Sequence, residues 1–133
     1  MRTRVLAVGT LILIGLTMFS SVVSAHHARA GYGDKDETLK GVVVEFKWRN
    51  PHVFITFDVK GADGKTVQWI GELSSVTTMI GMGMTRQSLK AGDEITITGV
   101  IAKTGTPESL LRKVTKSDGT VVADMGQANL REP

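Results

Sequence analysis

The chain of 133 residues contains no cysteine, and this absence excludes several kinds of structure and chemistry. Without cysteine there are neither disulfide bonds nor thiolate metal sites. No thiol is available as a nucleophile, and none follows the apolar N-terminal segment as a site for lipid attachment. The stability of the protein must therefore come from packing and from β-sheet hydrogen bonds.

Recognisable catalytic motifs are also missing from the sequence. There is no G-x-S-x-G elbow, and no pair of carboxylates has a spacing that singles it out. Gly81-x-Gly83 lacks the lysine and the strand-to-helix context of a phosphate-binding loop. We therefore predict that the protein is not an enzyme.

The chain after its N-terminal segment has almost no excess of positive charge. The chain has 16 basic and 13 acidic residues, and Arg2 and Arg4 are the only charged residues before residue 26. Residues 26–133 thus carry 14 basic against 13 acidic side chains, a net charge of +1. Proteins that bind nucleic acid concentrate positive charge in order to displace counterions, so we expect no nucleic-acid partner.

The N-terminal residues have the pattern of a secretory signal peptide. Two arginines precede an apolar run that begins at Val5, and Val23-Ser24-Ala25 offers small side chains at the positions that a signal peptidase reads. We predict cleavage before His26 and a periplasmic location, with membrane contact only through the signal peptide. Cleavage after Ala30 and an uncleaved N-terminal anchor are the alternatives.

The rest of the chain alternates between β-branched segments and turn residues. Residues 26–37 have no period and predict a flexible N-terminal arm, and residues 124–133 predict a C-terminal tail. Strands are predicted at residues 38–48, 52–59, 66–73, 94–102, 109–115 and 120–123. A short helix is predicted from a cap at Ser74 or Ser75 to about Ile80, and Gly99 predicts a bend in its strand.

This order of elements predicts an all-β fold with one short helix. Three meandering strands, a helix and two further strands are the order of the OB-fold, a five-stranded Greek-key barrel. We therefore predict an OB-like domain over residues 38–123, with a generic small β-barrel as the alternative.

Several short motifs are shared with a known family. They are His26-His27, Leu39-Lys40-Gly41-Val42-Val43, Asn50-Pro51-His52, Asp63-Gly64-Lys65, Trp69 with Glu72, residues 85–93, Gly99, Gly105 and Asp118-Gly119. From His26 to about Val122 the chain resembles a family of exported bacterial proteins known only as a domain of unknown function. The chain departs from the pattern of that family at Ala28, where a serine is usual, and at Met84, where a tryptophan is usual. The resemblance implies export and a barrel fold, but no activity.

The three histidines are the main functional clue. After the predicted cleavage, the free amine and imidazole of His26 can chelate one metal ion, and His27 or His52 can supply another nitrogen. Such a set of nitrogen ligands suits copper(II), and it is similar to the histidine brace of secreted copper proteins. Tetrahedral zinc is a weaker alternative because no thiolate is present. In the other interpretation, His26 and His27 lie in an exposed arm and His52 is a turn residue.

Two other groups of residues have a spacing that could form ligand sites. Trp48, Trp69 and Glu72 could form an apolar pocket with one carboxylate, or else core aromatics and a glutamate at the rim. Met79, Met82 and Met84 have a spacing that could hold copper(I), but flexible core filling explains them better.

These observations predict a periplasmic binding module. Its most concrete form binds copper through His26, His27 and His52. The alternative is a domain without a metal that binds a periplasmic protein or a small ligand.

Overall fold

The computed structural model describes residues 30–128, and the predicted signal peptide, His26, His27 and residues 129–133 lie outside this range. The compact unit that begins at Tyr32 contains all of the described strands. Their bounds are β1 Tyr32–Lys47, β2 Phe54–Lys60, β3 Thr66–Glu72, β4 Glu94–Ala102, β5 Glu108–Lys116 and β6 Val121–Asp124. Two short helices accompany them, α3 at Val76–Gly81 and α4 at Met125–Ala128.

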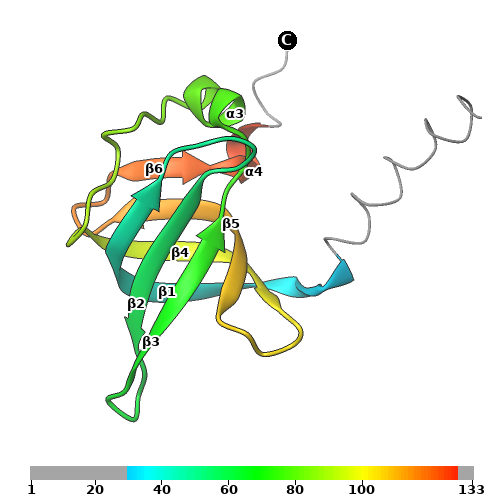
Figure 1. Ribbon diagram of the computed structural model, residues 1–133, viewed down its shortest axis with the longest axis vertical. Helices are drawn as coiled ribbons and strands as arrows, with labels where there is room; N and C mark the ends of the chain where they lie inside the picture. The colour runs from blue at the N-terminus through cyan, green and yellow to red at the C-terminus, as the bar shows by residue number, and fades with distance from the viewer. Residues whose placement is uncertain (1–29, 129–133) are drawn as a thin grey trace, which may run out of the picture. The chain divides into compact units, whose positions relative to one another are not determined.

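Five of the strands close into a ring (Figure 1). The sheet order is β3-β2-β1-β4-β5-β6, and a short parallel pairing between β3 and β5 joins the two sides. The meander β1-β2-β3, the helix α3 and the return of β4 to the far edge of β1 are the arrangement predicted from the sequence. The OB-like all-β prediction is therefore confirmed, with β6 added to β5 as a sixth strand outside the ring.

Strand β1 is longer than the sequence predicts. It begins at Tyr32, whereas the arm was expected to extend to residue 37. Residues 36–38 pair with Val100, Gly99 and Thr98 of β4, and all three are exposed. The first residues of β1 are therefore held by backbone pairing with β4, a strand distant in sequence. They bury too few side chains to show a hydrophobic period, so the sequence pattern does not predict them as a strand.

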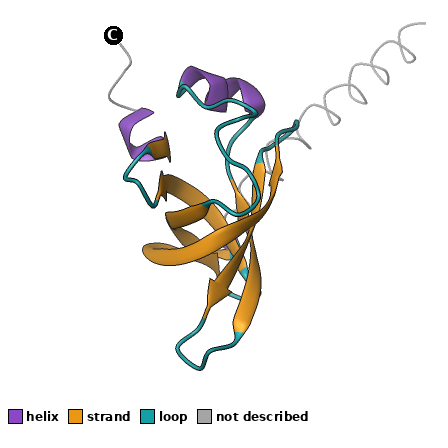
Figure 2. Cartoon of the chain, turned by 90° about the vertical axis from the view of Figure 1, so that its left-hand side faces the viewer, coloured by secondary structure: helices purple, strands orange, loops and turns teal. Residues whose placement is uncertain are grey.

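The core fills the inside of the ring. Phe57, Ile55, Met79 and Val53 are fully buried, and Met84 is nearly so. Phe57 lies opposite Val43 of β1 and Trp69 of β3, so one aromatic side chain connects three strands. Helix α3 begins at its predicted cap, where the Ser75 side chain accepts a hydrogen bond from the Thr78 backbone N–H. In Figures 1 and 2 this helix lies at the end of the ring opposite the β2–β3 turn.

Candidate functional site

His52 is placed against Glu72 by the end of the β2–β3 ladder. The Asn50–Pro51 bond is cis, and His52 follows it in the loop between β1 and β2. The next residue, Val53, is fully buried and donates its N–H to the Ser74 carbonyl at 3.0 Å, while the Leu73 N–H donates to the Val53 carbonyl at 2.8 Å. These two bonds hold the loop beside the end of β3, where His52 Nδ1 contacts Glu72 Oε1.

The contact defines the roles of the two imidazole nitrogens. An ionised carboxylate only accepts hydrogen bonds, so Nδ1 is the nitrogen that donates to Glu72. In the neutral ring, Nε2 then keeps a lone pair for another partner. The side chain of His52 is 47% exposed and that of Glu72 is 28% exposed, so a ligand can reach the pair from solvent. Metal-binding histidines commonly donate their second ring N–H to a carboxylate in this way.

Glu72 belongs to the outer surface of the ring. Gly71 is buried against Leu111, a core residue, and neighbouring strand residues face opposite sides of a sheet. Glu72 pairs with Leu110, and Leu110 pairs with Val100, so the three side chains lie on the same outer side of the sheet, where Val100 is only 7% exposed. We call this surface, made by Glu72, Leu110 and Val100 together with Tyr32 and Glu108, the Glu72 face.

Tyr32 brings the beginning of the described chain to the same face. It pairs with Ala102, two residues after Val100 on β4. Burial raises the pKa of Tyr32 above its ordinary value of 10.0, and the negative charges of Glu108 and Glu72 raise it further. Glu72 thus acts on two residues from the first half of the sequence: it contacts His52, and its negative charge raises the pKa of Tyr32.

The predicted pocket of Trp48, Trp69 and Glu72 is not formed as one group. Trp69 lies opposite Phe57 and packs against the core, whereas Glu72, three residues later, faces outward. Positions three apart in a strand lie on opposite sides of the sheet, which is why the Trp-x-x-Glu spacing does not join them. Trp48 also packs against the core, with its ring centroid 5.8 Å from that of Phe46.

The methionines have a structural role in the described residues. Met79 is fully buried, Met84 is 1% exposed, and Met82 packs partly buried against the same core. Their sulfurs therefore fill the end of the ring under α3, as the core interpretation of their spacing predicts.

The described part of the chain contains no group of three or more histidines and carboxylates placed to hold a metal ion. His52 is the one predicted metal ligand that lies within residues 30–128, because His26 and His27 fall outside them. Within the same residues, no helix has the length and apolar character needed to cross a membrane.

Sequence reasoning missed Tyr32 and Glu108 as members of this face. Both are brought there by pairings with strands distant in sequence, so no local pattern marks them. The one available signal was compositional, because Tyr32 is the single tyrosine of the chain.

Comparisons with known proteins identify a family but no activity. No curated protein matches the chain. Among solved structures, the chain is similar to the mitochondrial single-stranded DNA binding protein Rim1 from S. cerevisiae, with 10% identity and a TM-score of 0.48 over 62% of this chain and 93% of that one. A family profile matches residues 15–112, about three quarters of the sequence. The chain therefore belongs to the family of unknown function DUF6152.

Proposed function

We propose that this OB-like domain is an exported binding module that takes copper(II) on the Glu72 face, through His52 and the histidines at the start of the processed chain. The observation that carries the proposal is the contact between His52 Nδ1 and Glu72. It orients the imidazole and leaves Nε2 as the nitrogen available to a metal ion.

The proposal takes the remaining ligands from residues 26 and 27. Tyr32 lies on the Glu72 face, and His27 precedes it by five residues. Five residues of extended chain span at most about 18 Å, so the proposal requires His52 Nε2 to lie within that reach of Tyr32. If the signal peptide is removed before His26, its new terminal amine adds a nitrogen without any further side chain.

The chemistry of these groups favours copper(II) over other common ions. Amine and imidazole nitrogens bind copper(II) tightly and can adopt its square-planar geometry. Glu72 and Glu108 add negative charge beside the proposed position, which favours a bound cation. A structural zinc site would need four protein ligands in a closed tetrahedron, and cysteine is absent.

The test begins with the protein as cells export it. Mass spectrometry of the secreted chain is expected to give His26 as the first residue. Copper(II) titration, followed by electron paramagnetic resonance, is then expected to show nitrogen ligation with submicromolar affinity. His52→Ala should weaken binding by more than about 100-fold, and Glu72→Gln by about tenfold, because outer partners of metal ligands typically contribute 10–100-fold.

Glu45→Gln is the matched control for Glu72→Gln. Glu45 forms a surface pair with Lys47 on β1, and its substitution removes the same charge without touching His52. Its copper affinity should equal that of the unmodified protein. Copper binding that is unchanged by His52→Ala, or a secreted chain that begins elsewhere, would contradict the proposed site and favour a docking domain without a metal.

A further inference from the structure

The first half of β3 has a strand partner on one side only. The whole of β3 pairs with β2, whereas its pairing with β5 covers only Ile70–Glu72. Among residues 30–128, no strand therefore lies along the second side of residues 66–69. In Figures 1 and 2 the β2–β3 hairpin projects from the ring, so a second molecule can approach this side. We call Thr66, Val67 and Gln68 the β3 edge.

The direction of one hydrogen bond identifies the free backbone groups of the β3 edge. The Ile70 N–H donates to the Pro107 carbonyl at 2.9 Å, so the backbone groups of Ile70 point away from β2. These groups alternate in direction along a strand, and those of Gln68 and Thr66 therefore point the same way. Within residues 30–128, no backbone group on that side bonds to either residue. Unpaired N–H and C=O groups at a strand edge are a template for another strand.

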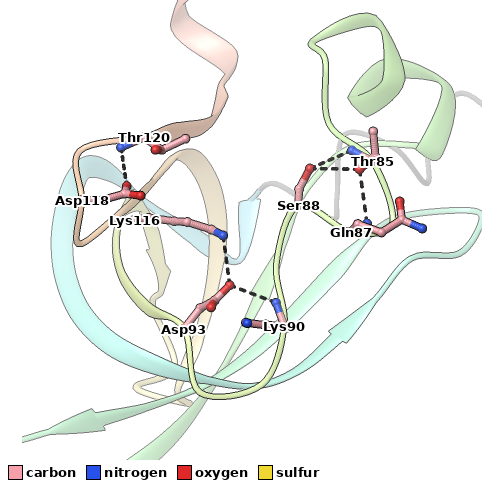
Figure 3. A network of polar contacts seen from close by, with 8 residues as sticks. All are labelled: Thr85, Gln87, Ser88, Lys90, Asp93, Lys116, Asp118 and Thr120. Atoms are coloured by element: carbon pink, nitrogen blue, oxygen red, sulfur yellow. Dashed lines mark hydrogen bonds and ion pairs between the residues drawn. The ribbon is translucent and has the colours of Figure 1, made fainter.

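Polar groups at other turns of the sheet have partners within the chain. Asp118 accepts the Thr120 N–H at 2.8 Å in the β5–β6 turn, and Asp93 lies 3.2 Å from Lys116 Nζ (Figure 3). The β3 edge has no such closure, and it contains neither a proline nor a charged side chain, the features that commonly protect an open edge. Another strand can therefore pair with it.

Ile70 limits the register in which two copies of the β3 edge can pair antiparallel. Thr66 and Gln68 have free backbone groups, whereas the N–H of Ile70 is engaged with Pro107. When Thr66 lies opposite Gln68 of a second copy, two residue pairs form, and each exchanges two backbone hydrogen bonds. The two-fold axis then passes between the two Val67 residues. A register centred on Gln68 would instead place Thr66 opposite the engaged Ile70.

The side chains are complementary in the register centred on Val67. The two Val67 side chains, each 45% exposed, would meet at the axis in a close, non-hydrogen-bonded pair. Thr66 and Gln68 would face each other as neutral polar groups. Lys65 would lie opposite Trp69 of the second copy, and an ammonium group beside an indole ring is favourable. Because no like charges face each other across the axis, the β3 edge fits a second copy of itself.

From this arrangement we infer that the chain forms a two-fold symmetric dimer through antiparallel pairing of two β3 edges. The shared edge is short, and interfaces that bury less than about 1,200 Å² are weak, so we expect a dissociation constant in the micromolar range or above. Glu72 lies at the other end of β3, five residues or about 17 Å from Val67, so the dimer does not depend on copper binding.

Sedimentation equilibrium over a range of concentrations tests the inference, with the full chain purified in the form that the cell produces. An equilibrium between monomer and dimer is expected. Hydrogen exchange at the backbone amides of Thr66 and Gln68 should slow as the concentration rises, because pairing engages these two groups. Val67→Lys should weaken dimerisation at least about tenfold, since it replaces the apolar contact at the axis by two facing ammonium groups.

Val121→Lys is the matched control for Val67→Lys. It makes the same change at a valine that is 51% exposed on β6, a strand outside the ring, and it should dimerise like the unmodified protein. A mixture of Val67→Lys and Val67→Glu chains should restore the dimer, because residue 67 faces residue 67 of the other copy. Thermal unfolding verifies that each variant is folded. A monomer even at millimolar concentration, equal effects of Val67→Lys and Val121→Lys, or a mixture that stays monomeric would overturn the inference.

Discussion

At the scale of single residues, Asp93 connects three parts of the fold. Its side chain, 14% exposed, accepts the Lys90 N–H and pairs with Lys116 at the end of β5, while its carbonyl accepts the Val43 N–H from β1 at 2.9 Å. Burial acts to raise the pKa of Asp93. The hydrogen bond from Lys90 and the positive charge of Lys116 outweigh this effect, so the pKa lies below its ordinary value of 3.8.

This lowered pKa predicts how stability depends on pH. The unfolded chain takes up a proton at Asp93 at a higher pH than the folded chain does, so the charged group stabilises the fold above pH 3.8. Asp93→Asn should therefore lower the free energy of unfolding at pH 7. The deficit should shrink as the pH falls below 3.8 and through the folded pKa. Urea denaturation at a series of pH values measures this effect.

Asp34→Asn serves as the comparison, since Asp34 is exposed on β1. It should leave stability unchanged across the same range. A deficit for Asp93→Asn that is independent of pH would show that the ionised carboxylate does not stabilise the turn.

At the scale of elements, one bulge in β1 and one in β4 determine which side chains of these strands face the core. The sequence places Val42, Val44, Phe46 and Trp48 in one alternating series. The structure divides this series, because a register shift between Val43 and Glu45 changes which side of β1 faces inward. Val43 is buried, Val42 and Val44 are each 41% exposed, and Phe46 and Trp48 pack against the core. A bulge of one residue reverses the period, so the alternation alone could not identify the buried face.

The second bulge lies at Gly99, where the sequence predicts a bend. The register of β4 with β5 shifts between Thr98 and Gly99, and a Cβ at residue 99 would lie 2.3 Å from the Leu110 carbonyl oxygen. Gly99→Ala should therefore lower the free energy of unfolding by about 1–3 kcal/mol, since a backbone atom must move to make room.

Gly81→Ala adds the same methyl group at a position where no neighbouring atom obstructs it. A Cβ at the last residue of α3 would have no atom within 4 Å, so alanine should raise stability by about 0.5–1 kcal/mol through its better helix propensity. Chemical denaturation measures the change in the free energy of unfolding for both substitutions. Similar effects of the two substitutions would contradict the steric explanation for Gly99.

At the scale of the whole molecule, closure of the ring makes one core that all five strands share. β3 and β5 are parallel and pair over Ile70–Glu72 and Glu108–Leu110, where the Ile70 N–H also donates to the Pro107 carbonyl at 2.9 Å. Because a single core is enclosed, we expect the strands to unfold together.

Phe57→Ala tests this shared core. The side chain of Phe57 is 0% exposed, so its truncation should lower the free energy of unfolding by about 3–5 kcal/mol. Fluorescence and circular dichroism should report the same transition. Val67→Ala, at a side chain that is 45% exposed, should cost less than about 0.5 kcal/mol. Separate transitions in the two signals would contradict a single cooperative core.

The sequence by itself determined the local features of this protein. The Ser75 cap, the bend at Gly99 and the order of the strands follow from residue types and periods within a few positions of one another, so they could be predicted. The OB-like arrangement followed from that order.

Only the tertiary structure decided which side chains meet. His52 and Glu72 are 20 residues apart, and Asp93 pairs with Lys116 of β5. Trp69 and Glu72, close in sequence, were separated instead, because a strand turns positions three apart to opposite sides. Such groupings depend on strand register and ring closure, which result from long-range backbone pairing and from burial of the core.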